Sequence, residues 1–223
     1  MNLPRYTTAE KLVGETPLVV LERVREKLNI PKDTPLAYAG RLDPMASGKL
    51  LILIGDECKV QERYHAFDKE YVVEVLLGAH SDTGDVLGLI ELGTQSEVVS
   101  PQVTPLLTSL VGTISLPYPK FSSKTIKGKP LHTWTLENRL HEIEIPMNTS
   151  RIYSLKMNNL RPISKEEVLK TVLNKIETIP KVTDARKALG ADFRRDDVRA
   201  SWDTVARSPR DTFFLLTFTC IAS

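Results

Sequence analysis

The sequence predicts an α+β fold. Three observations favour this class. Strand-like segments are grouped along the chain, helical segments are interspersed among them, and one long helical block comes late, at about residues 164–210. The regular alternation of strand and helix that a doubly wound α/β sheet requires is not seen in the pattern.

The first predicted helix begins near residue 16. Thr16 is a residue type that caps helix N-termini, and Pro17 suits the first helical position. Apolar residues then recur three or four positions apart, which predicts a single apolar face. The members of this face are Leu18, Leu21, Val24 and Leu28.

Two strands are predicted next. The continuous apolar run Leu50–Ile54 is typical of a strand buried on both faces. Residues 71–78 predict a second strand, and its alternation places one set of side chains on a single face. That set is Tyr71, Val73, Val75 and Leu77. A turn at residues 81–85 and a third strand at 87–92 follow.

The rest of the chain alternates less regularly. We expect a short helix at 104–111 and strands at 112–116 and 152–157. Ser164, followed by Glu166 and Glu167, predicts the start of the helical block. Its later part shows an apolar face made of Phe193, Val198, Trp202 and Val205. The last segment, 212–221, alternates as a strand does, with Phe214, Leu216, Phe218 and Cys220 on one face.

Composition limits the class of protein. The 223 residues are 41% hydrophobic and 26% charged, which suits a globular protein of one large or two small domains. The net charge of +2 does not by itself indicate a nucleic-acid partner. No apolar run is long enough for a membrane span, and the N-terminus lacks a signal-peptide pattern. Two cysteines cannot form a disulfide framework, so a cytoplasmic location is expected.

The sequence contains none of the common cofactor or metal motifs. It has no Gly-x-Gly-x-x-Gly segment and no phosphate-binding P-loop. Its four histidines lack the spacing of zinc ligands. We therefore expect no cofactor, no nucleotide and no metal.

Two loop aspartates are candidates for chemistry. Asp82-Thr83-Gly84 matches the turn of aspartic proteases, but the residues before it are too polar for that fold, which favours an ordinary hairpin turn. Asp43 lies between two glycines, directly before the buried run at Leu50. Pro44 restricts the backbone after it, so the carboxylate is held firmly at the end of a core strand. A purely structural Asp-Pro loop remains the alternative.

Residues 40–48, Gly-Arg-Leu-Asp-Pro-Met-Ala-Ser-Gly, resemble the Gly-x-Leu-Asp-Pro-x-Ala-x-Gly signature of bacterial tRNA pseudouridine-55 synthases. Further segments resemble motifs of that family in the same order. They are Lys11–Gly14 with the helix after it, Leu53–Lys59, Asp68–Tyr71, Ser81–Gly88, and Pro119–Lys124 with Lys127–Lys129. The resemblance runs collinearly from about residue 11 to residue 156.

The resemblance implies a pseudouridine synthase fold, with a mixed, mostly antiparallel sheet and flanking helices. It implies isomerisation of a T-arm uridine of tRNA, with Asp43 as the catalytic carboxylate. Tyr71 matches the tyrosine that lies against the target base; read without the resemblance, it is also a plausible core residue of its strand. Tyr38, which replaces a histidine of the family pattern, and Arg41, Gly40 and Leu42 complete the expected substrate contacts.

The resemblance also implies RNA contacts by lysines. Between Tyr118 and Leu140 the chain carries five basic residues and one acidic residue. Lysines of this kind contact phosphates without reading sequence. The expected RNA-binding residues are Lys11, Lys59, Lys124, Lys127 and Lys129. The expected partner is the T-arm of tRNA, and we expect the chain to bind it as a monomer.

The family pattern also gives reasons for alternatives. In the family, the strand resembling residues 214–222 leads into a segment with an arginine that pairs with the catalytic aspartate, and this sequence ends before it. We therefore expect a C-terminally incomplete catalytic domain over residues 1–223, with a helical insertion at 164–210 and no C-terminal RNA-binding module. The competing hypotheses are a non-catalytic tRNA-binding or RNA-folding module and an inactive fragment of the enzyme.

Overall fold

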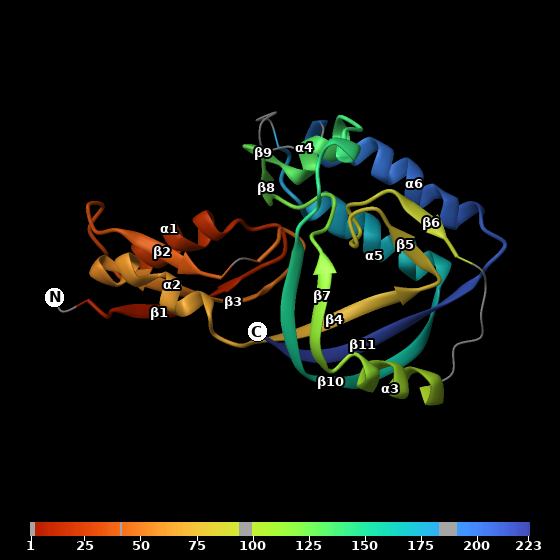
Figure 1. Cartoon of the computed structure of the whole chain (residues 1–223), viewed down its shortest axis with the longest axis horizontal. Coiled ribbons are helices and arrows are strands. Elements are labelled where there is room, and N and C mark those ends of the chain that lie inside the picture. Colours follow the sequence, from red (N-terminus) through yellow and green to blue (C-terminus); the bar gives the residue numbers. More distant parts are fainter. Residues whose placement is uncertain (1–2, 41, 94–99, 183–190) are drawn as a thin grey trace. The chain divides into compact units, whose positions relative to one another are not determined.

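The computed structural model of the chain describes residues 3–40, 42–93, 100–182 and 191–223 (Figure 1). The chain divides into two compact units. Unit 1 comprises Met1–Phe67 and Glu177–Pro180, and unit 2 comprises Asp68–Ile176 and Lys181–Ser223. Helices and antiparallel strands are mixed along the chain, which confirms the predicted α+β class.

Unit 1 is built on a three-stranded antiparallel sheet. Its order is β1 (Tyr6–Lys11), β3 (Gly48–Ile54) and β2 (Leu36–Ala39), so the predicted apolar strand lies in the centre. The helix α1 (Pro17–Lys27) packs on this sheet, and the 3-10 turn η1 (Gly55–Val60) and short α2 (Glu62–His65) follow β3. Neither β1 nor β2 was predicted, because neither has a regular apolar alternation.

The helix α1 begins as predicted, and Leu21, Val24 and Leu28 of the predicted face pack in the unit 1 core. The Thr16 hydroxyl accepts a hydrogen bond from the Val19 amide at 3.3 Å, which confirms the N-cap. Leu18 was expected in the core, yet it is 63% exposed. Val20 takes its place, fully buried with Leu21 and Val24, because these three share the side of the helix that meets the sheet.

Unit 2 contains a four-stranded antiparallel sheet. Its order is β4 (Lys69–Leu77), β11 (Thr212–Ala222), β10 (Met147–Ser164) and β7 (Gly112–Pro117). The strand β10 is much longer than the predicted 152–157. Register shifts at Ile152/Ser154 and Met157/Asn159 interrupt its ladder with β11, and such bulges break the alternation that sequence patterns rely on.

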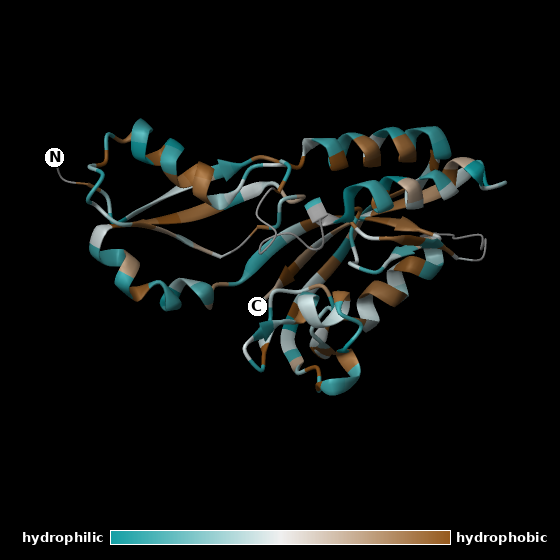
Figure 2. Ribbon diagram, turned by 90° about the horizontal axis from the view of Figure 1, so that it is seen from above, coloured by the Kyte–Doolittle hydropathy of each residue, from teal (hydrophilic) through white to brown (hydrophobic). Residues whose placement is uncertain are grey.

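Helices cover the two faces of this sheet (Figure 1). The helices α5 (Lys165–Thr178) and α6 (Arg195–Arg207), joined near η3 (Ala191–Arg194), bury one face and include the predicted Val198, Trp202 and Val205. The helix α3 (Ser100–Ser109) packs on the other. These helices carry both apolar and polar residues, as expected for amphipathic helices that pack one side on a sheet (Figure 2).

The predicted helical block from Ser164 is thus present as α5 and α6. The Ser164 hydroxyl accepts from the Glu167 amide at 3.2 Å, which confirms the expected start. Phe193, expected on the apolar face, lies in η3, outside the part whose side chains are described.

Two short hairpins complete unit 2. The strands β5 (Ala79–Ser81) and β6 (Ile90–Leu92) pair with each other, so the third predicted strand is shorter than 87–92 because residues 82–88 form the turn. The strands β8 (Thr125–Ile126) and β9 (Lys129–Pro130) precede α4 (Leu131–Leu136) and η2 (Leu140–Glu142). Among the helices that the structure describes, none has the length and apolar character to cross a bilayer.

Replacing Trp202 by alanine tests the packing of the helical block. Trp202 is buried, and its indole N–H donates to the Val86 carbonyl at 3.0 Å. We expect Trp202→Ala to lower the free energy of unfolding by about 3–5 kcal/mol, measured by urea titration with circular dichroism. Leu106→Ala, at an exposed position of α3, is the control. Equal stability of the two variants would contradict this packing.

Candidate active-site loop and basic segment

Gly40 and residues 42–47 lie between the strands β2 and β3. The Ala46 amide donates to the Asp43 carbonyl at 2.9 Å, and the Gly14 amide donates to the Pro44 carbonyl at the same distance. Gly40 has a φ of +87°, a region that favours glycine. The backbone around Asp43 is therefore fixed by hydrogen bonds from both within and outside the loop.

Lys11 lies beneath this loop. It is the last residue of β1 and its side chain is fully buried. Its ammonium group donates to the carbonyls of Asp43 at 3.1 Å, Ala46 at 2.6 Å and Leu12 at 3.2 Å. Burial lowers the pKa of Lys11, and the nearby carboxylates of Glu15 and Asp43 partly offset that change.

This position corrects one sequence-based expectation. Lys11 was expected to contact RNA phosphates, but a fully buried ammonium group has no surface to offer a phosphate. Its three bonds to main-chain oxygens use all the donors of the group. Lys11 therefore holds the Asp43 loop, a role that the sequence did not indicate.

Tyr38 and Leu42 lie at the edge of the unit 1 core. Both are half-buried and pack against the cluster around Ile52. The Tyr38 carbonyl accepts a hydrogen bond from the Gln61 side chain at 2.8 Å. These contacts fix the two ends of the stretch that leads to Asp43, while Arg41 lies outside the described residues.

The carboxylate of Asp43 points to solvent. Its residue is exposed, and in the described parts of unit 1 no ion pair or hydrogen bond to the side chain is found. Lys11 contacts only its main chain. The arrangement is an exposed carboxylate on a rigid backbone, which is suited to act on a bound molecule.

Tyr71 lies on β4 of unit 2, where it is 42% exposed. Across the ladder it is paired with Cys220 of β11. Partial burial raises the pKa of the Tyr71 hydroxyl, so the phenol is neutral at physiological pH. The partly exposed ring offers an aromatic surface in this unit.

The expected RNA-binding lysines differ in their surroundings. The exposed Lys124 lies over the Tyr118 ring at 4.9 Å, and the exposed Lys127 donates to the Glu142 carbonyl at 3.1 Å. Lys129 instead pairs with the Glu137 carboxylate at 2.7 Å and lies over Trp134. In unit 1, Lys59 pairs with Asp56 at 2.6 Å on the surface, which raises the pKa of the lysine.

The segment Asp82–Gly84 forms an ordinary turn, as the hairpin interpretation predicted. The Asp82 carboxylate accepts from the Leu89 amide at 2.9 Å, and the Thr83 hydroxyl donates to the Asp85 carboxylate at 2.7 Å. A side chain at Gly88 would meet the Thr83 hydroxyl and the Asp82 carboxylate. The turn is therefore closed by its own polar groups.

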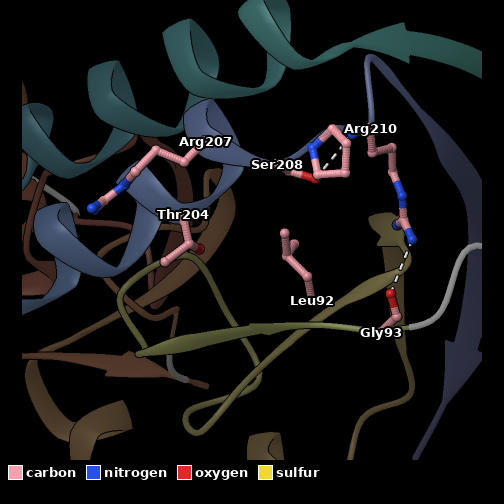
Figure 3. A pocket seen from close by; sticks show the side chains of 7 residues that line it. Leu92, Gly93, Thr204, Arg207, Ser208 and Arg210 are labelled. Carbon is pink, nitrogen blue, oxygen red and sulfur yellow. Dashed lines mark hydrogen bonds between the residues drawn. The ribbon is translucent and has the colours of Figure 1, made fainter.

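A hollow of about 590 Å³ lies elsewhere in unit 2, next to the end of α6 (Figure 3). Arg210 borders it and donates to the carbonyls of Gly78 and Gly93. None of the sequence-predicted site residues line this hollow. Within the described ranges, no group of three acidic, histidine or cysteine side chains is placed to hold a metal ion.

Comparison with known proteins identifies the family. A model described as TruB family pseudouridylate synthase, N-terminal domain, matches residues 25–190, which include Asp43, Tyr71 and the basic segment. The chain belongs to the TruB family. Membership confirms the resemblance seen in the motifs, and the matching model is described as one of pseudouridylate synthases.

Three curated relatives of the chain are each named tRNA pseudouridine synthase B. The protein of Caldicellulosiruptor saccharolyticus is 33% identical over 67% of this chain and 50% of its own length. That of Aquifex aeolicus is 31% identical over 70% and 53%. That of Nitrosomonas europaea is 37% identical over 48% and 38%. The chain thus spans about half the length of the curated relatives it matches.

A solved structure was also found, that of a Cbf5–Nop10–Gar1 complex. It is 14% identical, with a TM-score of 0.45, and the match covers 96% of this chain and 39% of that one.

Replacing Lys11 by methionine tests the loop anchor. The change removes one donor from each of three carbonyl oxygens. Those of Asp43 and Leu12 still accept from the amides of Ala46 and Glu15, whereas that of Ala46 loses its donor, at about 1–3 kcal/mol. The change also removes the cost of burying the charge. We expect a net loss of about 1–3 kcal/mol in the free energy of unfolding, measured by urea titration. Lys59→Met, at a surface lysine of the same unit, should not move the unfolding midpoint. A Lys11→Met variant as stable as the wild type would disprove the anchor.

Proposed function

We propose that this chain isomerises uridine to pseudouridine in the T-arm loop of tRNA, at position 55. Membership in the TruB family and relatives named tRNA pseudouridine synthase B support the reaction and the tRNA substrate. The observation that carries the proposal is Asp43, an exposed carboxylate on the motif loop held by the buried Lys11.

The reaction needs one well-placed carboxylate. The bond from ribose C1′ to N1 of uracil breaks, the base turns, and a bond from C1′ to C5 forms, while the proton on C5 leaves and one is gained at N1. Atoms and electrons balance without a redox partner or added water. In the proposed mechanism Asp43 attacks the base, attacks the sugar or removes a sugar proton, and its rigid loop keeps it in position for that step.

The substrate contacts follow the family motifs. In a folded tRNA loop the target uridine must leave its stack, and the Tyr71 ring replaces the lost stacking. Tyr38, Gly40, Arg41 and Leu42 contact the nucleotide near Asp43 in this proposal. Lys124 and Lys127 add phosphate contacts, because both are exposed in the basic segment.

We also propose a second candidate function, because the chain spans only about half the length of the curated relatives it matches. The alternative is a tRNA-binding or RNA-folding module without turnover, or an inactive fragment of the enzyme. Tight, salt-dependent binding of unmodified tRNA without pseudouridine formation would favour it. Under either function, we expect a monomer of the chain to bind one tRNA T-arm.

Replacing Asp43 by asparagine distinguishes the two functions. The amide keeps the size of the side chain and removes the charge, so we expect pseudouridine formation to fall by at least about 10²-fold with tRNA affinity retained. The assay measures pseudouridine at position 55 of an unmodified tRNA transcript. Asp33→Asn, at an exposed loop aspartate of the same unit, is the control. Equal turnover by the Asp43→Asn variant would overturn the catalytic assignment.

The salt dependence of tRNA binding tests the lysines one at a time. For Lys124→Ala and Lys127→Ala we expect the slope of log affinity against log salt to fall by about 0.7–0.9 each, as loss of one phosphate contact requires. Lys129→Ala should change it less, because its ammonium group is already paired with Glu137. If the Lys129 variant has the largest effect, the assignment of phosphate contacts is wrong.

A further inference from the structure

Three segments of unit 2 that are distant in the chain meet at Arg194. They are the Asp82 turn, the beginning of the basic segment at Phe121, and the junction of η3 with α6. Two of them resemble motifs of the family, whereas Arg194 belongs to the helical insertion. The insertion therefore contacts both motif segments through a single side chain.

The contacts of Arg194 are specific in geometry. Its two terminal nitrogens donate to the two carboxylate oxygens of Asp82, at 2.7 and 3.1 Å. The guanidinium carbon Cζ lies over the Phe121 ring, 4.3 Å from its centre. Its side chain is only 13% exposed, so solvent screens these contacts weakly.

The Asp82 carboxylate is itself fixed before it meets the arginine. It accepts from the Leu89 amide, and Gly88 leaves the space that this turn needs. Arg194 has a left-handed φ of +56°, a conformation that side-chain-bearing residues rarely adopt. Its contacts therefore select a backbone conformation that is otherwise unfavourable.

The segment that Arg194 holds is an excursion of the chain. Residues 118–146 leave the sheet after β7 and return at β10, and the Tyr118 amide closes the base by donating to the Pro146 carbonyl at 3.1 Å. Inside the excursion, Lys129 and Arg139 are paired with Glu137. Among the polar, ionic and ring contacts of the described residues, only Arg194 over Phe121 joins this excursion to the rest of unit 2.

We propose that Arg194 is a positioning residue, which clamps the excursion 118–146 to the Asp82 turn and so presents Lys124 and Lys127 to tRNA. This proposal rests on the proposed function in tRNA modification. In this proposal, Arg194 does not touch the reacting atoms of the uridine. The helical insertion thereby contributes to RNA affinity without binding RNA itself.

Hydrogen exchange of the 223-residue chain without RNA tests the clamp directly. In Arg194→Gln we expect the amides of residues 118–136 to exchange several-fold faster, while those of α5 stay as slow as in the wild type. Arg199→Gln, on the same helix α6, should leave both regions unchanged. Equal exchange of residues 118–136 in Arg194→Gln and the wild type would overturn the clamp.

Steady-state turnover of unmodified tRNA tests the consequence for RNA. We expect Arg194→Gln to raise KM about tenfold, within the roughly 5–150-fold range of coupled sites, with kcat nearly unchanged. Asp82→Asn should have the same effect, and the double variant should be no worse than either single one, because both remove one contact. A loss confined to kcat, or an equal effect of Arg199→Gln, would overturn the positioning role.

The two measurements separate the two proposals. If the wild-type chain neither binds nor modifies tRNA, the proposed function fails and the RNA part of the inference fails with it. Exchange in the absence of RNA still decides whether Arg194 clamps the excursion. If tRNA is bound but exchange is unchanged in Arg194→Gln, the clamp fails and the proposed function stands.

Discussion

The buried ammonium group of Lys11 is the contact on which the geometry of the Asp43 loop depends. It joins the end of β1 to two carbonyls of a loop more than thirty residues later in the chain. A charge in this position is costly unless it is fully bonded, so the three carbonyls and the lysine stabilise one another. An exposed carboxylate on such a backbone needs little further ordering when a substrate binds.

The basic residues between Tyr118 and Leu140 also differ in their surroundings: some are paired within the fold and others lie exposed on its surface. In the basic segment, Lys129 and Arg139 are paired with Glu137 and lie over Trp134, so they shape the excursion. Lys124 and Lys127 are exposed; Lys124 lies over the Tyr118 ring, Lys127 donates to the Glu142 carbonyl, and among the described residues neither lysine forms an ion pair. A count of basic residues treats these four alike, whereas their contacts show different roles.

The sequence correctly predicted the features that depend only on residues close together in the chain. The Thr16 cap, the central strand at Leu50 and the Asp82 turn all depend on neighbours in sequence, and all were found. The role of Lys11 was missed because a lysine gives no periodic signal of burial. The clamp at Arg194 was missed for a related reason, since its partner Asp82 is 112 residues away and only the folded chain brings them together. Whether Asp43 and Tyr71 act on the same nucleotide stays a prediction.

Titration of the lysine ammonium groups by NMR, in the chain labelled with ¹⁵N-lysine, tests the anchor most directly. The account predicts one ammonium signal, assigned to Lys11 by its absence in Lys11→Met, with protons slow to exchange and a pKa below the roughly 10.4 of an ordinary lysine. A Lys11 signal that exchanges rapidly and titrates with the surface lysines would contradict it.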